Sequence, residues 1–272
     1  QYSRRTTLRS MAVITLTSDF GLRDTTVALA KSRFIRRVSA PLLVDISHFV
    51  EPYNLAEAAF MLRRIHQEFP AGTVHCVFVG AAPKEGIEYI CLRSGGQFFI
   101  SANNGILTSV LRDRKVTGAR ILDIRGVDPS DVFDLYAAAT AHLLEGGKLE
   151  MLGPALTKVK NLKVSQPAVS DHAISGHIVY VDHLGTCVTN IPRTLLSAHQ
   201  NGRKATVETV RNRSIPKIYE RRAEVPQAAI AAHWDEYGML CIVVGKSGGE
   251  HIKGSNQLLG LKINDWVRID LI

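Results

Sequence analysis

Apolar and polar residues follow two different periods along residues 11–150. Short apolar runs of four to six residues, typical of buried strands, occur at Val13–Thr17, Leu42–Ile46, Val74–Val79, Tyr89–Arg93 and Phe98–Ser101. Between and after these runs, apolar residues recur at helical spacing over Thr25–Val38, Leu55–Phe69 and Ala137–Leu144. Because strands that alternate with helices are typical of α/β proteins, the pattern predicts an α/β domain with a largely parallel sheet.

The first predicted helix has an apolar face that is expected to lie in the core. Its members are Val27, Leu29, Ala30, Phe34 and Ile35. The alanine-rich helix is expected to stop at Gly146-Gly147. Two aromatic residues near it, Phe133 and Tyr136, are interpreted as core residues rather than as residues that stack on a ligand.

The pattern changes after Gly153-Pro154 and Pro167, where helical spacing nearly vanishes. Short β runs separated by turn residues follow at Ala173–Val181, Lys204–Val210, Met239–Val244 and Trp266–Ile272. These predict a smaller all-β domain, a barrel. We therefore expect an N-terminal extension over residues 1–10, an α/β domain over 11–165 and a β-barrel domain over 166–272.

Composition narrows the class of protein. The net charge of +8 comes from two segments, 1–10 and 203–222, which together hold ten basic and two acidic residues. The second segment has a single aromatic residue, Tyr219, so a solvated loop is favoured over a nucleic-acid surface.

Membrane, metal and redox functions find no support in the sequence. No apolar run approaches the ~20 residues that cross a bilayer, and residues 1–10 lead into no signal-like segment. The four cysteines form no CxxC pair and lie in apolar contexts. The chain is therefore expected to be cytoplasmic, with reduced cysteines and without a metal or cofactor.

Two motifs carry candidate chemistry, one in each half of the chain. Thr17-Ser18-Asp19-Phe20-Gly21 and Val181-Asp182-His183-Leu184-Gly185 each place a carboxylate directly after an apolar strand. A carboxylate in this position can accept hydrogen bonds from both hydroxyls of a ribose. Asp24 and Thr26 follow Asp19 closely enough to share its ligand. We expect one ligand held between the two domains.

The order of motifs along the chain resembles one family. The segments that carry the resemblance are Thr17–Gly21, Val44–His48, Phe69–His75, Asn103–Gly105 and Val181–His183 with Thr189-Asn190. Together they resemble the S-adenosylmethionine (SAM) hydroxide adenosyltransferases, or SAM hydrolases, which are related to SAM-dependent fluorinases and chlorinases. The resemblance implies an N-terminal α/β domain, a C-terminal β-barrel, and a homotrimer that binds its ligand between the N-domain of one subunit and the C-domain of its neighbour.

The resemblance also implies roles for individual residues, with SAM as substrate or ligand. Asp19, in the same motif as Phe20, would hold the ribose hydroxyls, and Tyr53 would cover the ligand. Asp24 and Thr26 would lie near the methionine end. Asp182 would meet the methionine ammonium, with Asn190 in the same turn. Asn104 belongs to the ligand-binding motifs but, like His48, is expected mainly to support the fold.

The chain departs from the family where water is activated. The hydrolases use an Asp-Arg-His set, and the matching segments here are Val79–Pro83, Gly86–Tyr89 and Asp131–Asp134, which lack these three residues. A serine that contacts halide in the halogenases would fall near Val132. In the second domain, Thr186 replaces an asparagine that faces adenine, and a Ser-Arg pair falls near Asp235-Glu236.

Two functions follow from these matches and departures. In the first, the chain is a hydrolase in which water attacks C5′ of SAM, giving adenosine and methionine. Its catalytic residues are then unassigned, and the candidates for orienting the water are Asp131, Asp134, Lys84 and Glu85. Alternatively, the chain binds SAM, adenosine or another nucleoside without catalysis, having kept the ribose carboxylate and lost the water-activating groups.

Overall fold

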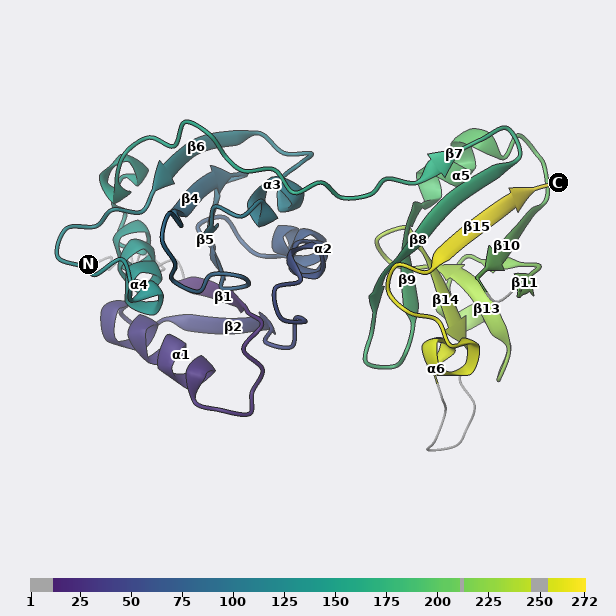
Figure 1. Ribbon diagram of the computed structural model, residues 1–272, viewed down its shortest axis with the longest axis horizontal. Coiled ribbons are helices and arrows are strands. Elements are labelled where there is room, and N and C mark those ends of the chain that lie inside the picture. Colours follow the sequence, from purple (N-terminus) through teal and green to yellow (C-terminus); the bar gives the residue numbers. More distant parts are fainter. Residues whose placement is uncertain (1–11, 211–212, 246–253) are drawn as a thin grey trace, which may run out of the picture. The chain divides into compact units, whose positions relative to one another are not determined.

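The computed structural model describes residues 12–210, 213–245 and 254–272, which form two compact units (Figure 1). The first unit ends at Lys163 and the second begins at Val164. Residues 1–10, predicted to be an extension, lie outside the described ranges. None of the helices in these ranges combines the length and apolarity that crossing a bilayer requires.

The first unit is built on a sheet with the strand order β2-β1-β3-β5-β4-β6. All its strands run parallel except β4, which pairs antiparallel with β5 and β6. This confirms the predicted, largely parallel α/β sheet. The strands are β1 (Val13–Thr17), β2 (Leu42–Ser47), β3 (Val74–Val77), β4 (Tyr89–Ser94), β5 (Gln97–Ala102) and β6 (Val116–Ile121).

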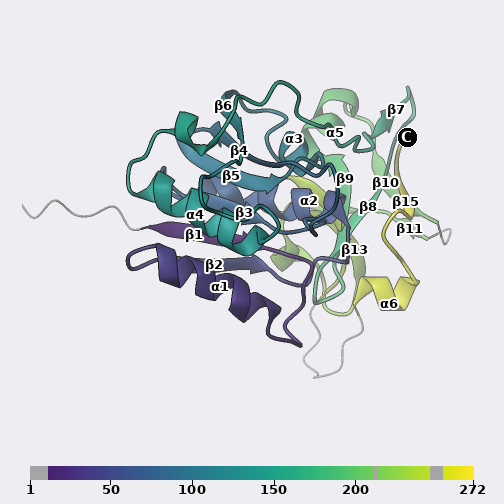
Figure 2. The same ribbon diagram turned by 60° about the vertical axis from the view of Figure 1, so that its left-hand side comes forward.

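Helices cover both faces of this sheet (Figures 1 and 2). On one face α1 (Thr26–Arg37) packs against α4 (Val132–Leu144), and on the other α2 (Leu55–Ile65) packs against α3 (Ile106–Val110). Two apolar cores result, one containing Phe34 of α1 and the other Leu62 of α2. The short 3-10 helices η1 (His66–Glu68) and η2 (Leu149–Leu152) complete the unit.

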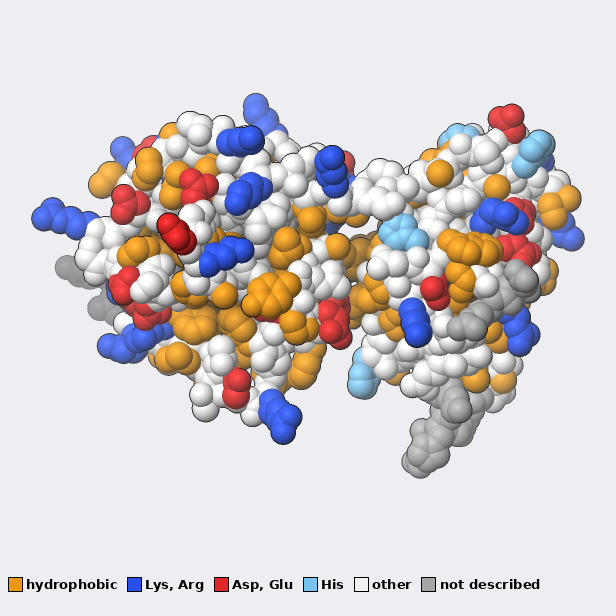
Figure 3. All heavy atoms as spheres, viewed as in Figure 1, with side chains coloured by type: hydrophobic (Ala, Val, Ile, Leu, Met, Phe, Trp, Pro, Cys, Tyr) orange, Lys and Arg blue, Asp and Glu red, His pale blue; other side chains and the backbone are white. Residues whose placement is uncertain are grey.

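The buried face of α1 is narrower than the sequence predicted. Val27, Ala30 and Phe34 are buried as expected, but Leu29 and Ile35 are 47% and 61% exposed. The helix therefore buries a narrower stripe than its sequence suggested, and Leu29 is left to face a pocket. Figure 3 shows other hydrophobic side chains gathered on the visible face of this unit, with charged side chains around them.

The alanine-rich helix α4 begins earlier than predicted because it is capped from its own sequence. Asp131 Oδ1 accepts a 3.0 Å hydrogen bond from the backbone N–H of Asp134, which satisfies one of the free N–H groups of the first turn. The cap fixes the Asp131 carboxylate at the helix N-terminus. This position becomes important for the site described below.

The second unit is a near-closed β-barrel, as predicted, with the order β11-β10-β15-β8-β9-β14-β13-β12 and β7 paired to β8. Contacts of β10 with β12 and of β11 with β13 bring its two ends together. Short helices α5 (Arg193–His199) and α6 (Ser255–Leu259) and the 3-10 helix η3 (Arg222–Glu224) were not predicted. The strands are β7 (Ala168–Val169), β8 (Ala173–Val181), β9 (Cys187–Pro192), β10 (Ala205–Thr209), β11 (Ser214–Ile215), β12 (Ile218–Tyr219), β13 (Ile230–Trp234), β14 (Met239–Val244) and β15 (Trp266–Leu271).

The fold brings three sequence segments together at one edge of the first sheet. Strands β1, β2 and β3 are parallel, so their carboxyl ends share this edge. Backbone hydrogen bonds join the segments that follow: Gly21 N–H donates to His48 O at 2.7 Å and Phe78 N–H donates to Thr17 O at 2.8 Å. Loops after parallel strands are where ligands bind in α/β folds, and a pocket lies here.

Candidate functional site

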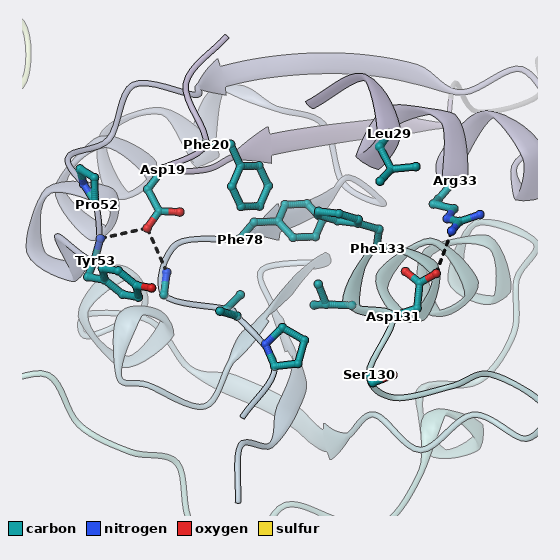
Figure 4. Close-up of a pocket in the computed structure, with 15 residues that line it drawn as sticks. Asp19, Phe20, Leu29, Arg33, Pro52, Tyr53, Phe78, Ser130, Asp131 and Phe133 are labelled. Atoms are coloured by element: carbon teal, nitrogen blue, oxygen red, sulfur yellow. Dashed lines mark hydrogen bonds and ion pairs between the residues drawn. The ribbon is translucent and has the colours of Figure 1, made fainter. Parts of the chain in front are cut away.

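A pocket of about 640 Å³ opens at this edge of the first unit (Figure 4). Its walls come from the segments after β1, β2 and β3, from α1, and from the start of α4. They comprise Asp19, Phe20, Leu29, Arg33, Pro52, Tyr53, Phe78, Gly80, Ala81, Ala82, Pro83, Ser130, Asp131, Val132 and Phe133. The volume is in the range that accommodates a small molecule of nucleoside size.

Asp19 lies at one end of the pocket, directly beyond β1. Its Oδ2 accepts hydrogen bonds from the backbone N–H of Tyr53, at 2.9 Å, and of Gly80, at 3.4 Å. Among the described residues, no donor reaches the other oxygen, Oδ1. Two backbone groups therefore hold the carboxylate in place through Oδ2, and Oδ1 keeps its capacity to accept hydrogen bonds. The predicted binding of ribose hydroxyls by Asp19 stays a prediction.

Tyr53 reaches Asp19 only by adopting an unusual backbone. Its φ is +60°, in the left-handed region that a bulky residue rarely enters, and its side chain is 70% exposed. Figure 4 shows the ring beside the Asp19 carboxylate at the pocket rim. The placement is compatible with the predicted role of Tyr53 as a cover for the ligand.

Gly80 allows the chain to pass closely over the same end of the pocket. Its φ is +60°, and a Cβ there would lie 3.1 Å from Leu55 Cδ2 and 3.4 Å from Asn104 Nδ2. Asn104 in turn donates from Nδ2 to Val79 O at 3.1 Å, and its Oδ1 accepts from Ile106 N–H at 3.2 Å. Both ends of the Asn104 amide are thus used to hold the loop, and Asn104 is not among the pocket-lining residues.

The middle of the pocket is aromatic. The ring of Phe20 lies 5.9 Å from Phe78 and 5.7 Å from Phe133, the latter edge-to-face, and Phe78 lies 5.6 Å from Phe133. The sequence interpretation of Phe133 as a core residue was incomplete, because its partly exposed ring also lines the pocket. Tyr136 is fully buried as predicted and stacks on Phe78 from behind, at 4.7 Å.

An ion pair lies at the other end of the pocket. Arg33 Nη2 of α1 donates to Asp131 Oδ2 of α4 at 2.9 Å, and the two side chains are 27% and 33% exposed. Of the four candidates for orienting water, only Asp131 lines the pocket; Asp134, Lys84 and Glu85 do not. Asp134 instead pairs with Arg37, whose guanidinium lowers the pKa of that carboxyl.

Comparison with known proteins agrees with this geometry. A model of the SAM hydroxide adenosyltransferase N-terminal domain matches residues 14–153, and one of the C-terminal domain matches residues 176–268. The chain belongs to the SAM hydroxide adenosyltransferase family. Both units described above are therefore the domains of this family, and the pocket lies in its N-terminal domain.

The proteins that this family member resembles are distant homologues. It is 28% identical to an (R)-S-adenosyl-L-methionine hydrolase of Thermus thermophilus, over 93% of this chain and 97% of that one. It is 26% identical to a fluorinase of an Actinoplanes species, over 67% and 72% of the two chains. An uncharacterized conserved protein of Thermotoga maritima has a structure with a TM-score of 0.82 and 27% identity, over 95% of this chain and 99% of that one.

This SAM hydroxide adenosyltransferase family member keeps small residues where the family resemblance expects part of the water-activating set. Gly80, Ala81, Ala82 and Pro83 all line the pocket and present no ionisable side chain to it. Within the described ranges, no histidine lines the pocket, and no group of histidines, cysteines and carboxylates could hold a metal ion. The polar side chains of the pocket are concentrated at its two ends.

Asp24 and Thr26, predicted to lie near the methionine end, are at the exposed start of α1. Thr26 N–H donates to Asp24 Oδ1 at 2.9 Å, and this hydrogen bond lowers the pKa of the Asp24 carboxyl. Neither residue lines the pocket. His48 lies in the segment after β2. Its Nδ1 shares a 2.7 Å hydrogen bond with Ser18 Oγ, and its Nε2 lies 3.1 Å from Asp45 Oδ1. Both contacts fit the predicted supporting role.

Asp182 and Asn190 lie in the second unit. Asp182 follows β8, and its Oδ1 accepts from Thr186 N–H at 2.8 Å, so it stabilises the turn that leads to β9. Asn190 was predicted in the same turn but is in strand β9, because the β8–β9 pairing begins again at Cys187. Its amide accepts from His177 N–H at 2.9 Å and donates to Ser165 O at 3.1 Å.

Proposed function

We propose that this family member hydrolyses SAM by attack of water at C5′ of the ribose, giving adenosine and methionine. The observation that carries the proposal is the Asp19 carboxylate, which has one oxygen fixed by the N–H groups of Tyr53 and Gly80 and the other open to a pocket of nucleoside size. An acceptor held in this way suits a vicinal diol, whose two hydroxyls are hydrogen-bond donors.

The aromatic middle of the pocket suits the reacting centre. Phe20, Phe78 and Phe133 exclude water and present rings to a sulfonium cation, which aromatic faces attract. In the reaction the water oxygen forms a bond to C5′, and the C5′–S bond breaks with its electron pair moving to sulfur. Methionine leaves as a neutral thioether, and the water-derived oxygen releases one proton to solvent.

This chemistry does not need a strong base in the pocket. The sulfonium is already a good leaving group, and the oxonium formed on attack is acidic enough to lose its proton to solvent as the products leave. Holding one water in line with the C5′–S bond within a dry pocket is then the main contribution of the protein. The small side chains of Ala81 and Ala82 leave room for such a water.

A second function, binding without turnover, is favoured by one specific observation. The segment that supplies an aspartate in the hydrolases is represented here by Gly80, Ala81, Ala82 and Pro83, and these residues line the pocket without offering a proton acceptor. Such a protein would keep the diol carboxylate and bind SAM or adenosine as a ligand.

Incubation with SAM separates the two functions. The purified full chain should convert SAM to adenosine and methionine in equal amounts, measured by chromatography against a sample without protein, and Asp19→Ala should abolish this conversion. If calorimetry shows that SAM binds and no adenosine forms even overnight, the binding function replaces hydrolysis. We also propose, from the family resemblance, that the chain forms a homotrimer; size-exclusion chromatography with light scattering should give three times the chain mass.

A further inference from the structure

We propose that the backbone N–H of Ala82, held in position by the hydroxyl of Tyr89, binds the oxygen at C5′: the attacking water before the reaction and the 5′-hydroxyl of adenosine after it. The inference rests on the proposed function, in particular on the binding of the ribose at Asp19. It makes Tyr89 a positioning residue, because its effect on the ligand passes through the peptide between Ala81 and Ala82.

The first argument comes from the peptide between Val79 and Gly80. Asn104 Nδ2 donates to Val79 O at 3.1 Å, and Gly80 N–H, on the other side of the same peptide, donates to Asp19 Oδ2 at 3.4 Å. A trans peptide is planar, and its C=O and N–H groups point in opposite directions. A side chain that binds the carbonyl from within the protein therefore turns the N–H towards the pocket.

The peptide between Ala81 and Ala82 repeats this arrangement. Tyr89 donates its hydroxyl to Ala81 O at 2.9 Å. Tyr89 is buried and does not line the pocket, whereas Ala82 is exposed and does. The N–H of Ala82 accordingly points away from Tyr89, and it makes no hydrogen bond within the described ranges. A free donor thus faces the pocket from a segment whose side chains are aliphatic.

Tyr89 is suited to hold this peptide. Its backbone is fixed, since it is the first residue of β4 and its carbonyl accepts a 2.7 Å hydrogen bond from Leu122 N–H. Burial raises the pKa of its hydroxyl from the ordinary value of 10.0, so the group keeps its proton around neutral pH and remains a donor to Ala81 O. Without the hydroxyl, the Ala81 carbonyl would lack this partner and the peptide could turn.

The position of the donor suits an oxygen that attacks C5′. Ala82 lies two residues beyond Gly80, so their N–H groups are at most about 7 Å apart. This span is comparable to the separation between the ribose hydroxyls and an oxygen in line to attack C5′ of the same ribose. Donation to that oxygen holds it in place and favours its deprotonated form. The oxygen then bonds to C5′ as the C5′–S bond breaks with its electron pair moving to sulfur, and its proton passes to solvent.

A second buried tyrosine provides a matched control. Tyr136 lies edge-to-face against Tyr89, with 5.8 Å between the ring centroids, in the same apolar core. Unlike the hydroxyl of Tyr89, that of Tyr136 has no hydrogen-bond partner among the described residues. Tyr89→Phe and Tyr136→Phe each remove one hydroxyl from this core, but only the first releases the peptide between Ala81 and Ala82.

The test is a calorimetric titration of the full chain with adenosine and with 5′-deoxyadenosine, which differ only in the 5′-hydroxyl. We expect the wild-type chain and Tyr136→Phe to bind adenosine about fivefold more tightly or better, as one hydrogen bond implies. In Tyr89→Phe this ratio should fall to within about twofold of unity, with the affinity for 5′-deoxyadenosine unchanged.

Turnover of SAM by the same three proteins provides the second readout. The kcat should fall about tenfold or more in Tyr89→Phe, because the attacking oxygen is no longer held in line, and should stay within about twofold of wild type in Tyr136→Phe. A ratio or a kcat that survives in Tyr89→Phe, or that falls equally in Tyr136→Phe, overturns the inference. An equal loss of affinity for both nucleosides in Tyr89→Phe also overturns it, because the hydroxyl would then support the fold rather than the 5′-oxygen.

The outcome is separable from that of the proposed hydrolysis. If the ratio falls as expected but the wild-type chain does not convert SAM to adenosine, the Ala82 donor stands as the site of the 5′-hydroxyl and the hydrolase function fails. If SAM is converted and the ratio does not change, the function stands and the oxygen binds elsewhere. If neither nucleoside binds at millimolar concentration, both are overturned.

Discussion

The backbone N–H of Tyr53 donates a 2.9 Å hydrogen bond to Oδ2 of Asp19, and Tyr53 makes this contact from a left-handed backbone with φ +60°. A tyrosine in this conformation costs on the order of 1–2 kcal/mol relative to ordinary backbone. The protein therefore accepts strain at this position while fixing the carboxylate that we assign to the ribose. Strain of this kind is more often kept for function than for stability.

Replacement of Tyr53 by glycine should separate these two effects. Tyr53→Gly removes the steric cost of positive φ, so the free energy of unfolding should stay the same or rise by up to about 1 kcal/mol, since the flexibility of glycine offsets part of the gain. The affinity for adenosine should fall because the exposed ring no longer covers the pocket. Urea unfolding and calorimetry measure the two quantities, and Tyr53→Phe, which keeps the ring, is the control. A large loss of stability would show that the side chain serves the fold.

Asp19 should discriminate between nucleosides by their diol. Wild-type protein should bind adenosine more tightly than 2′,3′-dideoxyadenosine by roughly 2–4 kcal/mol, the value of two charge-assisted hydrogen bonds. In Asp19→Asn the amide oxygen can still accept from Tyr53 N–H, but the preference should shrink to less than about 1 kcal/mol. Calorimetric titration of both nucleosides measures this. An undiminished preference in the variant would place the diol elsewhere.

The stability of the N-terminal domain should fall in acid because of His75. Its side chain is fully buried. Nδ1 shares a 2.8 Å hydrogen bond with Thr15 Oγ1, and the ring stacks on Phe99 with 4.8 Å between the ring centroids. Burial, reinforced by the nearby His66, lowers the pKa of His75 from 6.5 to about 3. The unfolded chain thus takes up a proton near pH 6.5, whereas the folded chain does not until about pH 3. The contribution of neutral His75 to the free energy of unfolding is therefore complete above pH 6.5, and it is lost as the pH falls from 6.5 towards 3.

Urea unfolding at about pH 7.5 and about pH 5 tests this contribution. Between these two pH values the free energy of unfolding of the wild-type chain should fall by on the order of 2 kcal/mol more than that of His75→Gln. The glutamine cannot take up the proton. Glutamine is polar and can keep a hydrogen bond to Thr15, so the variant should fold. Equal losses in the two proteins would mean that His75 titrates normally in the folded state.

The sequence pointed to Asp19 and Asp131, one at each end of the pocket, but it did not show that Arg33 lies beside Asp131. Asp19 could be placed because a carboxylate after a buried strand lies at the carboxyl edge of a parallel sheet wherever the other strands fall. Arg33 could not, because its contact with Asp131 depends on how α1 and α4 cross, which a single sequence does not fix. One signal was present: basic residues four apart at Arg33 and Arg37 face acidic residues three apart at Asp131 and Asp134.

Other details depended on tertiary context in the same way. Asn190 was assigned to a turn because the sequence did not show where β9 begins, whereas the pairing of Val181 with Cys187 sets it in the strand. Phe133 has the apolar character of a core residue, and only the position of the α4 N-terminus places its ring in the pocket wall. The left-handed backbone of Tyr53 is likewise imposed by its neighbours rather than by the preference of tyrosine.

The central claim is that water attacks C5′ of SAM in the Asp19 pocket, and isotope labelling tests it most directly. The full chain is incubated with SAM in water enriched in ¹⁸O, and the products are analysed by mass spectrometry beside an Asp19→Ala sample. We predict adenosine with ¹⁸O in its 5′-hydroxyl, together with unlabelled methionine, in the wild-type sample only. Adenosine without the label, or products no different from those of Asp19→Ala, would contradict the account.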